Sequence, residues 1–231
     1  MLISDKDLAR IAEHVPIEGT EDCLVRAAVA IILRDGERGT EFLLMQRAIH
    51  DNDPWSGQIS FPGGKIDPKD NSAKAAAIRE ADEEVNAKLV EQDYIGRLDD
   101  IYGFKIDHIH SVRVSSFVFK VDRELDLIPN HEVASLVWLP ISYLENANNV
   151  YEHYASQNPT LKMPAVLIDR NQEQILWGLT LRMLSQLYQL LDLPMAVFSQ
   201  QQRKELLDIQ NRNITSKEIK DLRKNRLKES V

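Results

Sequence analysis

The chain carries a dense group of carboxylates in the sequence Arg79-Glu80-Ala81-Asp82-Glu83-Glu84-Val85. On a helical wheel, Glu80, Glu83 and Glu84 fall within about 100° of one another and therefore share one narrow face. Like charges at this spacing are unfavourable by roughly 0.2–0.5 kcal/mol per pair, so the face needs a counter-charge. Hard divalent cations such as Mg²⁺ and Mn²⁺ bind oxygen ligands of this kind, commonly together with substrate phosphates. The cluster therefore predicts a site for Mg²⁺ or Mn²⁺.

A glycine turn lies upstream of these carboxylates. In Pro62-Gly63-Gly64 the missing side chains let the backbone approach closely, offering a carbonyl to a metal or N–H groups to a phosphate. Arg79 stands four residues before Glu83, the spacing of a helical ion pair that would orient this carboxylate. A glutamate-rich helix face alone is usually just a solvated surface. Its combination with the glycine turn favours a metal site.

Helices are expected where the hydrophobic pattern has the helical period. Residues 73–85 are rich in alanine and lack Gly and Pro, and either Asn71 or Ser72 can cap the start. Residues 175–191 carry a broad stripe of leucines, which predicts a second helix. A short amphipathic helix is expected within residues 1–20, with Val15 as part of its apolar face.

Strands are predicted over residues 23–33, 41–47, 94–98, 112–121, 135–139 and 165–168. The first two bracket a turn that contains Gly36 and Gly39, so they should be adjacent. Strands on both sides of the acidic helix, followed by a final helix, describe an α/β fold: an α/β/α sandwich with a mixed sheet. A regular alternation of strand and helix is absent, which disfavours a doubly wound sheet.

The composition bounds the class of protein. The chain has 231 residues, of which 43% are hydrophobic and 28% charged, as in ordinary globular proteins. The longest apolar run has seven residues, too few to cross a bilayer, and the start has no secretory pattern. The single cysteine, Cys23, permits no internal disulfide. We therefore expect a cytoplasmic protein without a membrane partner. Phosphate-binding P-loop and serine-nucleophile motifs are also absent.

Charge divides the chain into two parts. Residues 199–231 have nine Lys or Arg against five Asp or Glu, a net charge of +4, whereas residues 1–198 have 19 against 31, or −12. We predict one domain over residues 1–198 and a charged, net basic tail over residues 199–231. Because the tail mixes both signs, it favours a solvated helix over a nucleic-acid-binding arm, and nucleic acid is not an expected partner.

The glycine turn and the acidic segment together resemble the signature of the Nudix hydrolases. That signature runs glycine, five residues, glutamate, seven residues, and then Arg-Glu-hydrophobic-x-Glu-Glu-x-Gly-hydrophobic. Here Gly64 is followed by five residues, Asp70, eight residues and the acidic segment, with Asn86 in place of the last glycine. Asparagine tolerates the left-handed conformation better than most residues, so this last difference is mild. The resemblance covers residues 24–139 directly.

The resemblance implies a Nudix sandwich that hydrolyses a P–O–P bridge with the help of Mg²⁺ or Mn²⁺. The metal ligands that it implies are Glu80, Glu83, Glu84 and the carbonyl of Gly63. Nudix enzymes often add a metal-site glutamate from a loop before a late strand, and Glu132 is similar in position. Glu83 and Glu132 are both candidates for the acid that takes the proton, because metal binding lowers the pKa of a carboxylate and weakens it as a base. Arg79 would support catalysis by holding Glu83.

Further segments, 43–47, 56–64, 77–81 and 175–180, resemble the coenzyme A pyrophosphatase branch of the family, which also shares the extra residue in the signature. The departure is Trp55, which stands where that branch tends to carry histidine. The resemblance favours coenzyme A or its derivatives as the substrate. Alternatives are ADP-ribose, nucleotide sugars and dinucleotides or, from a different class, a non-catalytic nucleotide-sensing module. The three retained acids favour an enzyme. A homodimer is left open.

The roles of some other residues also stay open. Arg47 and Lys65 are candidates for phosphate contacts, and Trp55 is either a stacking platform for a base or a packed loop anchor. The loop acids Asp99 and Asp100 face either the substrate or solvent. His108 and His110 lack a third ligand, so no zinc site is expected there.

Overall fold

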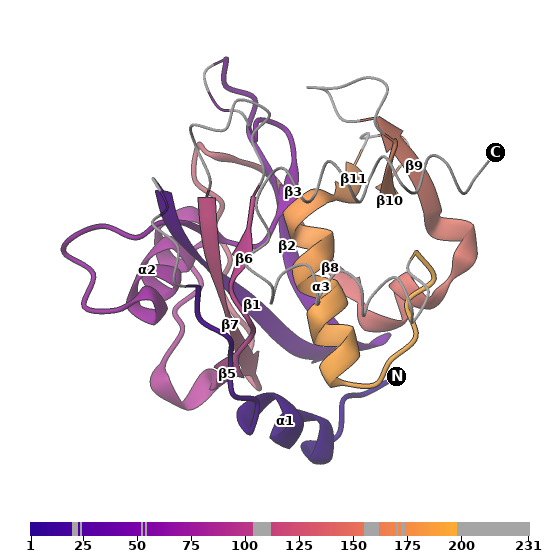
Figure 1. Ribbon diagram of the computed structural model, residues 1–231, viewed down its shortest axis with the longest axis horizontal. Coiled ribbons are helices and arrows are strands. Elements are labelled where there is room, and N and C mark those ends of the chain that lie inside the picture. Colours follow the sequence, from indigo (N-terminus) through magenta and orange to yellow (C-terminus); the bar gives the residue numbers. More distant parts are fainter. Residues whose placement is uncertain are drawn as a thin grey trace.

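The computed structural model describes residues 1–19, 23, 25–51, 53, 55–103, 112–154, 162–169, 171 and 174–197. Helix α2 (Ala73–Val85) covers one face of a mixed β-sheet. Helices α1 (Asp5–Ala12) and α3 (Gly178–Leu190) pack on the opposite face (Figure 1). The molecule is therefore the α/β/α sandwich that the sequence predicts.

The main sheet contains eight strands in the described part of the chain. Its strands are β1 (Val25–Gly36), β2 (Gly39–Arg47), β3 (Ile59–Ser60), β4 (Gly63–Lys65), β5 (Tyr94–Arg97), β6 (Ile101–Tyr102), β7 (Val112–Val121) and β8 (Val133–Pro140). Strand β1 runs parallel to β7 and antiparallel to β2 and β4, while β8 pairs with the far side of β2. Short 3₁₀ helices cover Glu91–Asp93, Ile141–Glu145 and Ala147–Asn149.

Strand β1 is the centre of the core. Its residues 28–33 are all buried, as expected for a strand covered on both faces. Ala28, Ala30 and Ile32 belong to the hydrophobic cluster beneath α2. The intervening Val29, Ile31 and Leu33 belong to the cluster beneath α1 and α3, so side-chain alternation along one strand supplies both layers.

Helix α2 has the bounds that the sequence predicts. The Oγ atom of Ser72 accepts a 3.1 Å hydrogen bond from the Ala75 amide, so Ser72 is the N-cap. The helix ends where Asn86 adopts a left-handed conformation with φ 56°. Alanines and Val85 on one side of the helix pack on the sheet, which fixes the direction in which the carboxylates point.

The prediction of a helix over residues 175–191 is wrong at its start. Residues Gln174–Trp177 form strand β11, which pairs with β10 (Lys162–Asp169), and β10 pairs with β9 (Val150–Tyr154) in a separate three-stranded sheet. Gly178, at φ 64°, is the first residue of α3 and changes the chain direction between β11 and the helix. The segment Ile175-Leu176-Trp177 has strand propensity and pairs with β10. The helical spacing of the leucines over residues 175–191 does not reveal this pairing.

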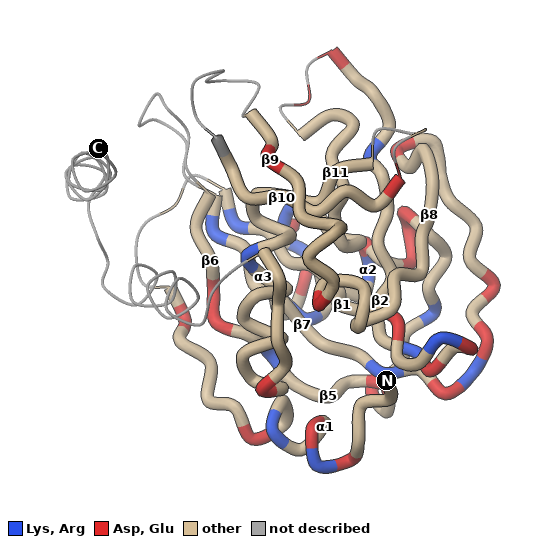
Figure 2. Tube along the Cα trace, turned by 90° about the vertical axis from the view of Figure 1, so that its right-hand side faces the viewer, with Lys and Arg blue, Asp and Glu red and all other residues tan. Residues whose placement is uncertain are grey.

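The N-terminal helix is shorter than its apolar residues suggest. Helix α1 buries Ile11, whereas Val15 lies beyond the helix and is 84% exposed. Ser4 caps its start through a reciprocal pair of hydrogen bonds with Asp7. In Figure 2, charged residues gather around α1 and at the ends of the main strands. None of the described helices is both long and apolar enough to span a bilayer.

Candidate functional site

Two glycines bring strand β4 against both β1 and helix α2. A Cβ atom on Gly63 would lie 2.4 Å from the carbonyl oxygen of Ala28, and one on Gly64 would lie 2.6 Å from the carboxyl carbon of Glu80. The amide of Gly63 donates a 2.8 Å hydrogen bond to Oε2 of Glu84. The close approach inferred for the turn is therefore present, and it places backbone directly beside two of the acids.

Glu84 is a buried carboxylate at the base of this site. Its side chain is only 3% exposed, and burial raises its pKa to about 8. The hydrogen bond from Gly63 and the Nη1 atom of Arg47, 3.7 Å from Oε1, act in the opposite direction without cancelling the effect. A buried acid with so little compensation is well suited to a cation.

The three acids of the shared helix face differ in depth. Glu83 is 57% exposed at its side chain, whereas Glu80 is largely covered. Burial raises the pKa of Glu80, Arg79 opposes this effect, and the charges of Glu83 and Glu132 add to it. The helix face thus presents carboxylates from the buried base of the site to its solvent edge.

Arg79 links the acids to the loop before the helix. Its Nη1 atom lies 2.9 Å from oxygens of both Glu80 and Glu83, so the predicted contact with Glu83 is present. Its Nε and Nη2 atoms donate to Asp70 at 2.9 and 3.0 Å, and Nη2 also donates to the carbonyl of Lys65 at 3.2 Å. Hydrogen bonding to Asp70 is the main reason that the pKa of Arg79 is raised.

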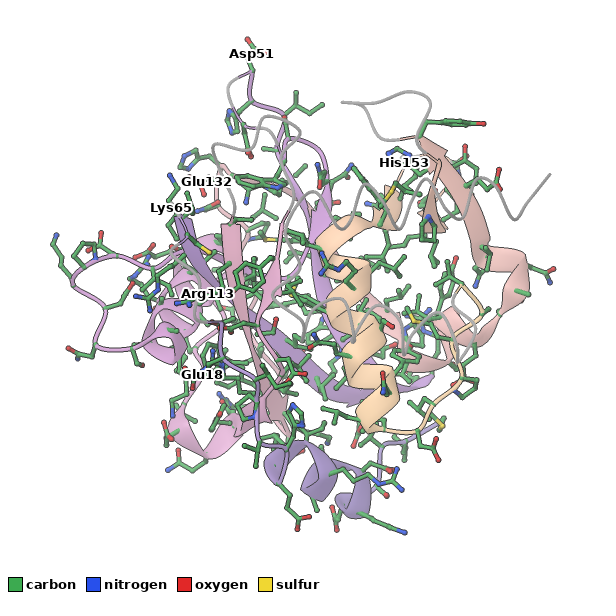
Figure 3. The ribbon with its side chains drawn as sticks, viewed as in Figure 1. Glu18, Asp51, Lys65, Arg113, Glu132 and His153 are labelled. Carbon is green, nitrogen blue, oxygen red and sulfur yellow. The ribbon has the colours of Figure 1, made fainter. Side chains whose placement is uncertain are left out.

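Glu132 reaches the same region from the loop before β8. Its charge is among those that raise the pKa values of Glu80 and Glu84, which places it near both. Its amide donates to Oδ1 of Asn130 at 2.7 Å, and its carbonyl accepts from the amide of Ala48 at 2.7 Å. Figure 3 shows Glu132 and Lys65 in the upper left of the view. The sequence prediction did not identify the contribution of Asn130.

A β-bulge interrupts the pairing between β2, which carries Arg47, and β8, which follows the loop of Glu132. Gln46 of β2 pairs with Ser135 and Arg47 pairs with Val133, so Ala134 is an extra residue on β8. Val133 packs in the cluster beneath α2, and Ala134 is exposed. The bulge lies at the start of β8, directly after the loop of Glu132.

The three predicted substrate contacts have different surroundings. Arg47 is bound by Asp53 through Nε and Nη2 at 3.0 and 2.8 Å, a partner that the sequence analysis missed. Lys65 is exposed at the end of β4. Trp55 is half-buried and packs against the core cluster beneath α3, the arrangement expected of a loop anchor.

Asp99 and Asp100 face neither of the two environments expected of them. Asp99 accepts hydrogen bonds of 2.8 Å from the amide of Ile17 and from Nε2 of His14. Asp100 accepts from Oγ of Ser115 at 2.7 Å and from the amide of Gly19 at 2.9 Å. Both side chains are buried and tie the N-terminal segment to the sheet. His108, His110 and residues 199–231 lie outside the described residues.

The donor chemistry fits a hard divalent cation. The site offers only oxygen ligands, one of them on a buried carboxylate whose pKa is about 8. In the part of the chain that the structure describes, no three His, Cys, Asp or Glu side chains already converge as a metal cage. A cation would compete with Arg79 for the oxygens of Glu80 and Glu83.

Comparison with known proteins identifies the family of this chain. The family model of the NUDIX domain matches residues 24–159, more than half of the chain. The chain belongs to the Nudix family. An uncharacterized Nudix hydrolase, NudL, from Photorhabdus laumondii subsp. laumondii is 32% identical over 135 residues, which are 58% of this chain and 68% of that protein. NudL from Escherichia coli K12 is 33% identical over 121 residues, 51% of this chain and 58% of that relative.

A solved structure of a MutT/nudix family protein from Enterococcus faecalis supports the fold. It has a TM-score of 0.52 and 14% identity, and the match covers 90% of this chain and 80% of that one. At this identity the likeness concerns the Nudix fold alone. The family model and the NudL relatives mark the chain as a Nudix hydrolase, an enzyme of the pyrophosphatase class.

Proposed function

We propose that this Nudix hydrolase cleaves the P–O–P bridge of a nucleoside diphosphate linked to another moiety, with coenzyme A or a derivative as the favoured substrate. The observation that carries this proposal is the buried Glu84, held by the Gly63 amide beside Glu80 in an oxygen-only site. Glu80, Glu83, Glu84 and the carbonyl of Gly63 would hold Mg²⁺ or Mn²⁺.

Each residue would have a distinct task. A divalent cation held by these ligands would neutralise the diphosphate and lower the pKa of the attacking water. Arg79 orients Glu83 through their 2.9 Å contact. Glu83 or Glu132 accepts the proton from water, and both are exposed enough for a water molecule to reach them. Glu132→Gln tests this assignment more cleanly than Glu83→Gln, which also removes a proposed metal ligand; loss of the base lowers kcat by about 10²–10⁴-fold.

Three further residues would bind the substrate. Arg47 lies 3.7 Å from Glu84, where its guanidinium can contact a phosphate placed next to the metal. Lys65, exposed on β4, would contact a second phosphate oxygen. Trp55 would offer an exposed part of its ring to a base, while the rest of the side chain anchors the loop.

Coenzyme A is favoured over other diphosphates by the segments that resemble the coenzyme A pyrophosphatase branch. Within the same class of enzyme, the alternatives are ADP-ribose, nucleotide sugars and dinucleotides. A non-catalytic nucleotide-sensing module is a weaker candidate, because binding alone does not require three clustered acids. We also propose residues 1–198 as the catalytic domain and residues 199–231 as a separate tail.

A substrate panel tests the proposal. The full chain would be assayed with coenzyme A, ADP-ribose, a nucleotide sugar and a dinucleoside polyphosphate, each with Mg²⁺ or Mn²⁺. We expect hydrolysis that depends on the metal, with coenzyme A cleaved at the highest kcat/KM. Preference for another diphosphate would overturn the choice of substrate alone. Binding of nucleotides without any turnover would favour the sensing module.

A further inference from the structure

The segment before β8 replaces solvent as the partner of the carbonyl groups at the end of helix α2. The amide of Ile128 donates to the carbonyl of Val85 at 3.0 Å, and that of Asn130 to the carbonyl of Glu84 at 2.8 Å. Side-chain amides make two more bonds, from Asn86 to the carbonyl of Asp126 and from Asn130 to that of Glu83. The carbonyls of Glu83, Glu84 and Val85 have no partner within the helix. The segment before β8 therefore binds along the C-terminal end of α2.

Asn130 is the residue of this segment that also contacts Glu132. Its Nδ2 atom donates to the carbonyl of Glu83 at 3.0 Å, while its Oδ1 atom accepts from the amide of Glu132 at 2.7 Å. Both partners are backbone groups of fixed polarity, so the orientation of the side-chain amide is unambiguous. One side chain therefore connects the backbones of two candidate site acids, Glu83 and Glu132.

Glu132 is held on its other side as well. Its carbonyl accepts a 2.7 Å hydrogen bond from the amide of Ala48, next to Arg47 at the end of β2. With its amide and its carbonyl both bound, an exposed loop residue has its backbone fixed near Glu80 and Glu84. Because a misplacement of about 1 Å can cost a hundredfold in rate, such fixation matters at a reactive site.

We propose that Asn130 is a positioning residue, which sets the distance between Glu132 and the carboxylates of α2. This inference rests on the proposed function, in which Glu132 acts at the metal site. The backbone amide of Asn130 already binds the carbonyl of Glu84 on α2, so the side-chain oxygen that accepts from the Glu132 amide is the part that an alkyl group cannot replace. Asn130 itself need not contact the substrate or the metal.

Three variants separate positioning from general stability. Asn130→Ala removes both side-chain bonds. Asn130→Ser keeps an oxygen that can accept from the amide two residues on, but it loses the bond to the Glu83 carbonyl. Asn86→Gly is the matched control: it removes an amide bond between the same helix end and the same segment, at a left-handed position that glycine tolerates.

The kinetic readout is kcat for coenzyme A, or for the panel diphosphate that the wild type cleaves fastest. We expect Asn130→Ala to lower kcat about 10- to 100-fold, Asn130→Ser to stay within about threefold of wild type, and Asn86→Gly within about twofold. A wild-type kcat in Asn130→Ala would overturn the proposal. So would an Asn130→Ser enzyme as impaired as Asn130→Ala, or a Glu132→Gln enzyme with wild-type kcat.

A second readout does not require turnover. In metal-free protein, amide hydrogen exchange at Glu132 should accelerate about tenfold or more in Asn130→Ala and remain near wild type in Asn86→Gly. The Mn²⁺ affinity of Asn130→Ala, measured by electron paramagnetic resonance without substrate, should fall. Unchanged exchange and unchanged affinity would contradict the inference. If the wild type cleaves no diphosphate, the proposed function fails, and these two measurements still decide the role of Asn130.

Discussion

The peptide N–H of Gly63 donates a 2.8 Å hydrogen bond to the buried carboxylate of Glu84. This contact joins two segments that are 21 residues apart in the chain and places the glycine turn against the acidic helix. The neighbouring Gly64 leaves room for the carboxylate of Glu80. The turn and the helix are thus one structural unit, and the proposed metal chemistry depends on both.

Replacing Glu84 by Gln should change how stability depends on pH. Burial raises the pKa of Glu84 from 4.5 to about 8, so folding favours the neutral acid. Its contribution to stability is fully present below pH 4.5 and is lost as the pH rises through about 8. Between pH 5 and pH 8, the metal-free wild type should therefore lose on the order of 3–4 kcal/mol relative to Glu84→Gln. Urea unfolding at several pH values measures this difference.

The same variant should lose its response to metal. Mg²⁺ that binds only the folded state stabilises it by RT ln(1 + [Mg²⁺]/Kd), so it should raise the melting temperature of the wild type and leave that of Glu84→Gln unchanged. If the free energy of unfolding of the two metal-free proteins changed with pH in the same way, the pKa of Glu84 would not be raised by burial as expected.

A methyl group at Gly64 should disturb the site and spare the fold. The added Cβ would lie 2.6 Å from the carboxyl carbon of Glu80, which is the mobile end of a side chain. We expect Gly64→Ala to displace this carboxylate, lowering kcat/KM about tenfold or more with a small change in melting temperature.

Gly36→Ala provides the control for Gly64→Ala. Its Cβ would lie 2.6 Å from a carboxylate oxygen of Glu41, the same kind of clash at the β1–β2 hairpin. This variant should retain wild-type kinetics. Equal losses of activity in the two alanine variants would attribute the effect to general destabilisation instead of the position of Glu80.

Removing the charge of Glu83 should reduce turnover without unfolding the protein. Its side chain is 57% exposed, so Glu83→Gln costs little stability, but it removes a proposed metal ligand. We expect kcat to fall at least about tenfold. Asp82→Asn is the adjacent control, because Asp82 pairs with Lys88 and lies outside the proposed ligand set. Mg²⁺-dependent hydrolysis unchanged by Glu83→Gln would refute the mechanism.

Deleting residues 199–231 should leave catalysis largely unchanged. The tail carries a net charge of +4 and contributes none of the proposed site residues. Steady-state kinetics of residues 1–198 would test this, and sedimentation of both proteins would show whether either forms a homodimer. A large drop in kcat would make the tail part of the active unit.

The sequence predicted correctly those elements whose ends are set by neighbouring residues. Helix α2 matches its predicted bounds because an alanine-rich run is capped by Ser72 and ended by Asn86. Strand β11 was mistaken for helix because its pairing with β10 depends on contacts outside the segment. Strand β9 was missed because its side chains are mostly exposed and show no alternation of burial. Tertiary pairing outweighs local propensity in both strands.

The sequence predicted which residues form the site better than it predicted their burial and hydrogen-bond partners. The helical wheel placed Glu80, Glu83 and Glu84 on one face, but only packing against Gly63 shows that Glu84 is the buried one. Asp99 and Asp100 were misplaced because the N-terminal amides that bind them, those of Ile17 and Gly19, lie more than 80 residues earlier in the chain. The Asn-x-Glu spacing of Asn130 and Glu132 is typical of a local side-chain turn and offered a usable signal.

Hydrolysis in ¹⁸O-labelled water would show whether water attacks a diphosphate in a metal-dependent reaction. Products of coenzyme A would be separated and weighed by mass spectrometry after incubation with Mg²⁺ or Mn²⁺. We expect two phosphomonoester products, one of which carries a single ¹⁸O atom, and no reaction in the presence of a chelator. Cleavage that persists without metal, or label in neither phosphate, would contradict this expectation.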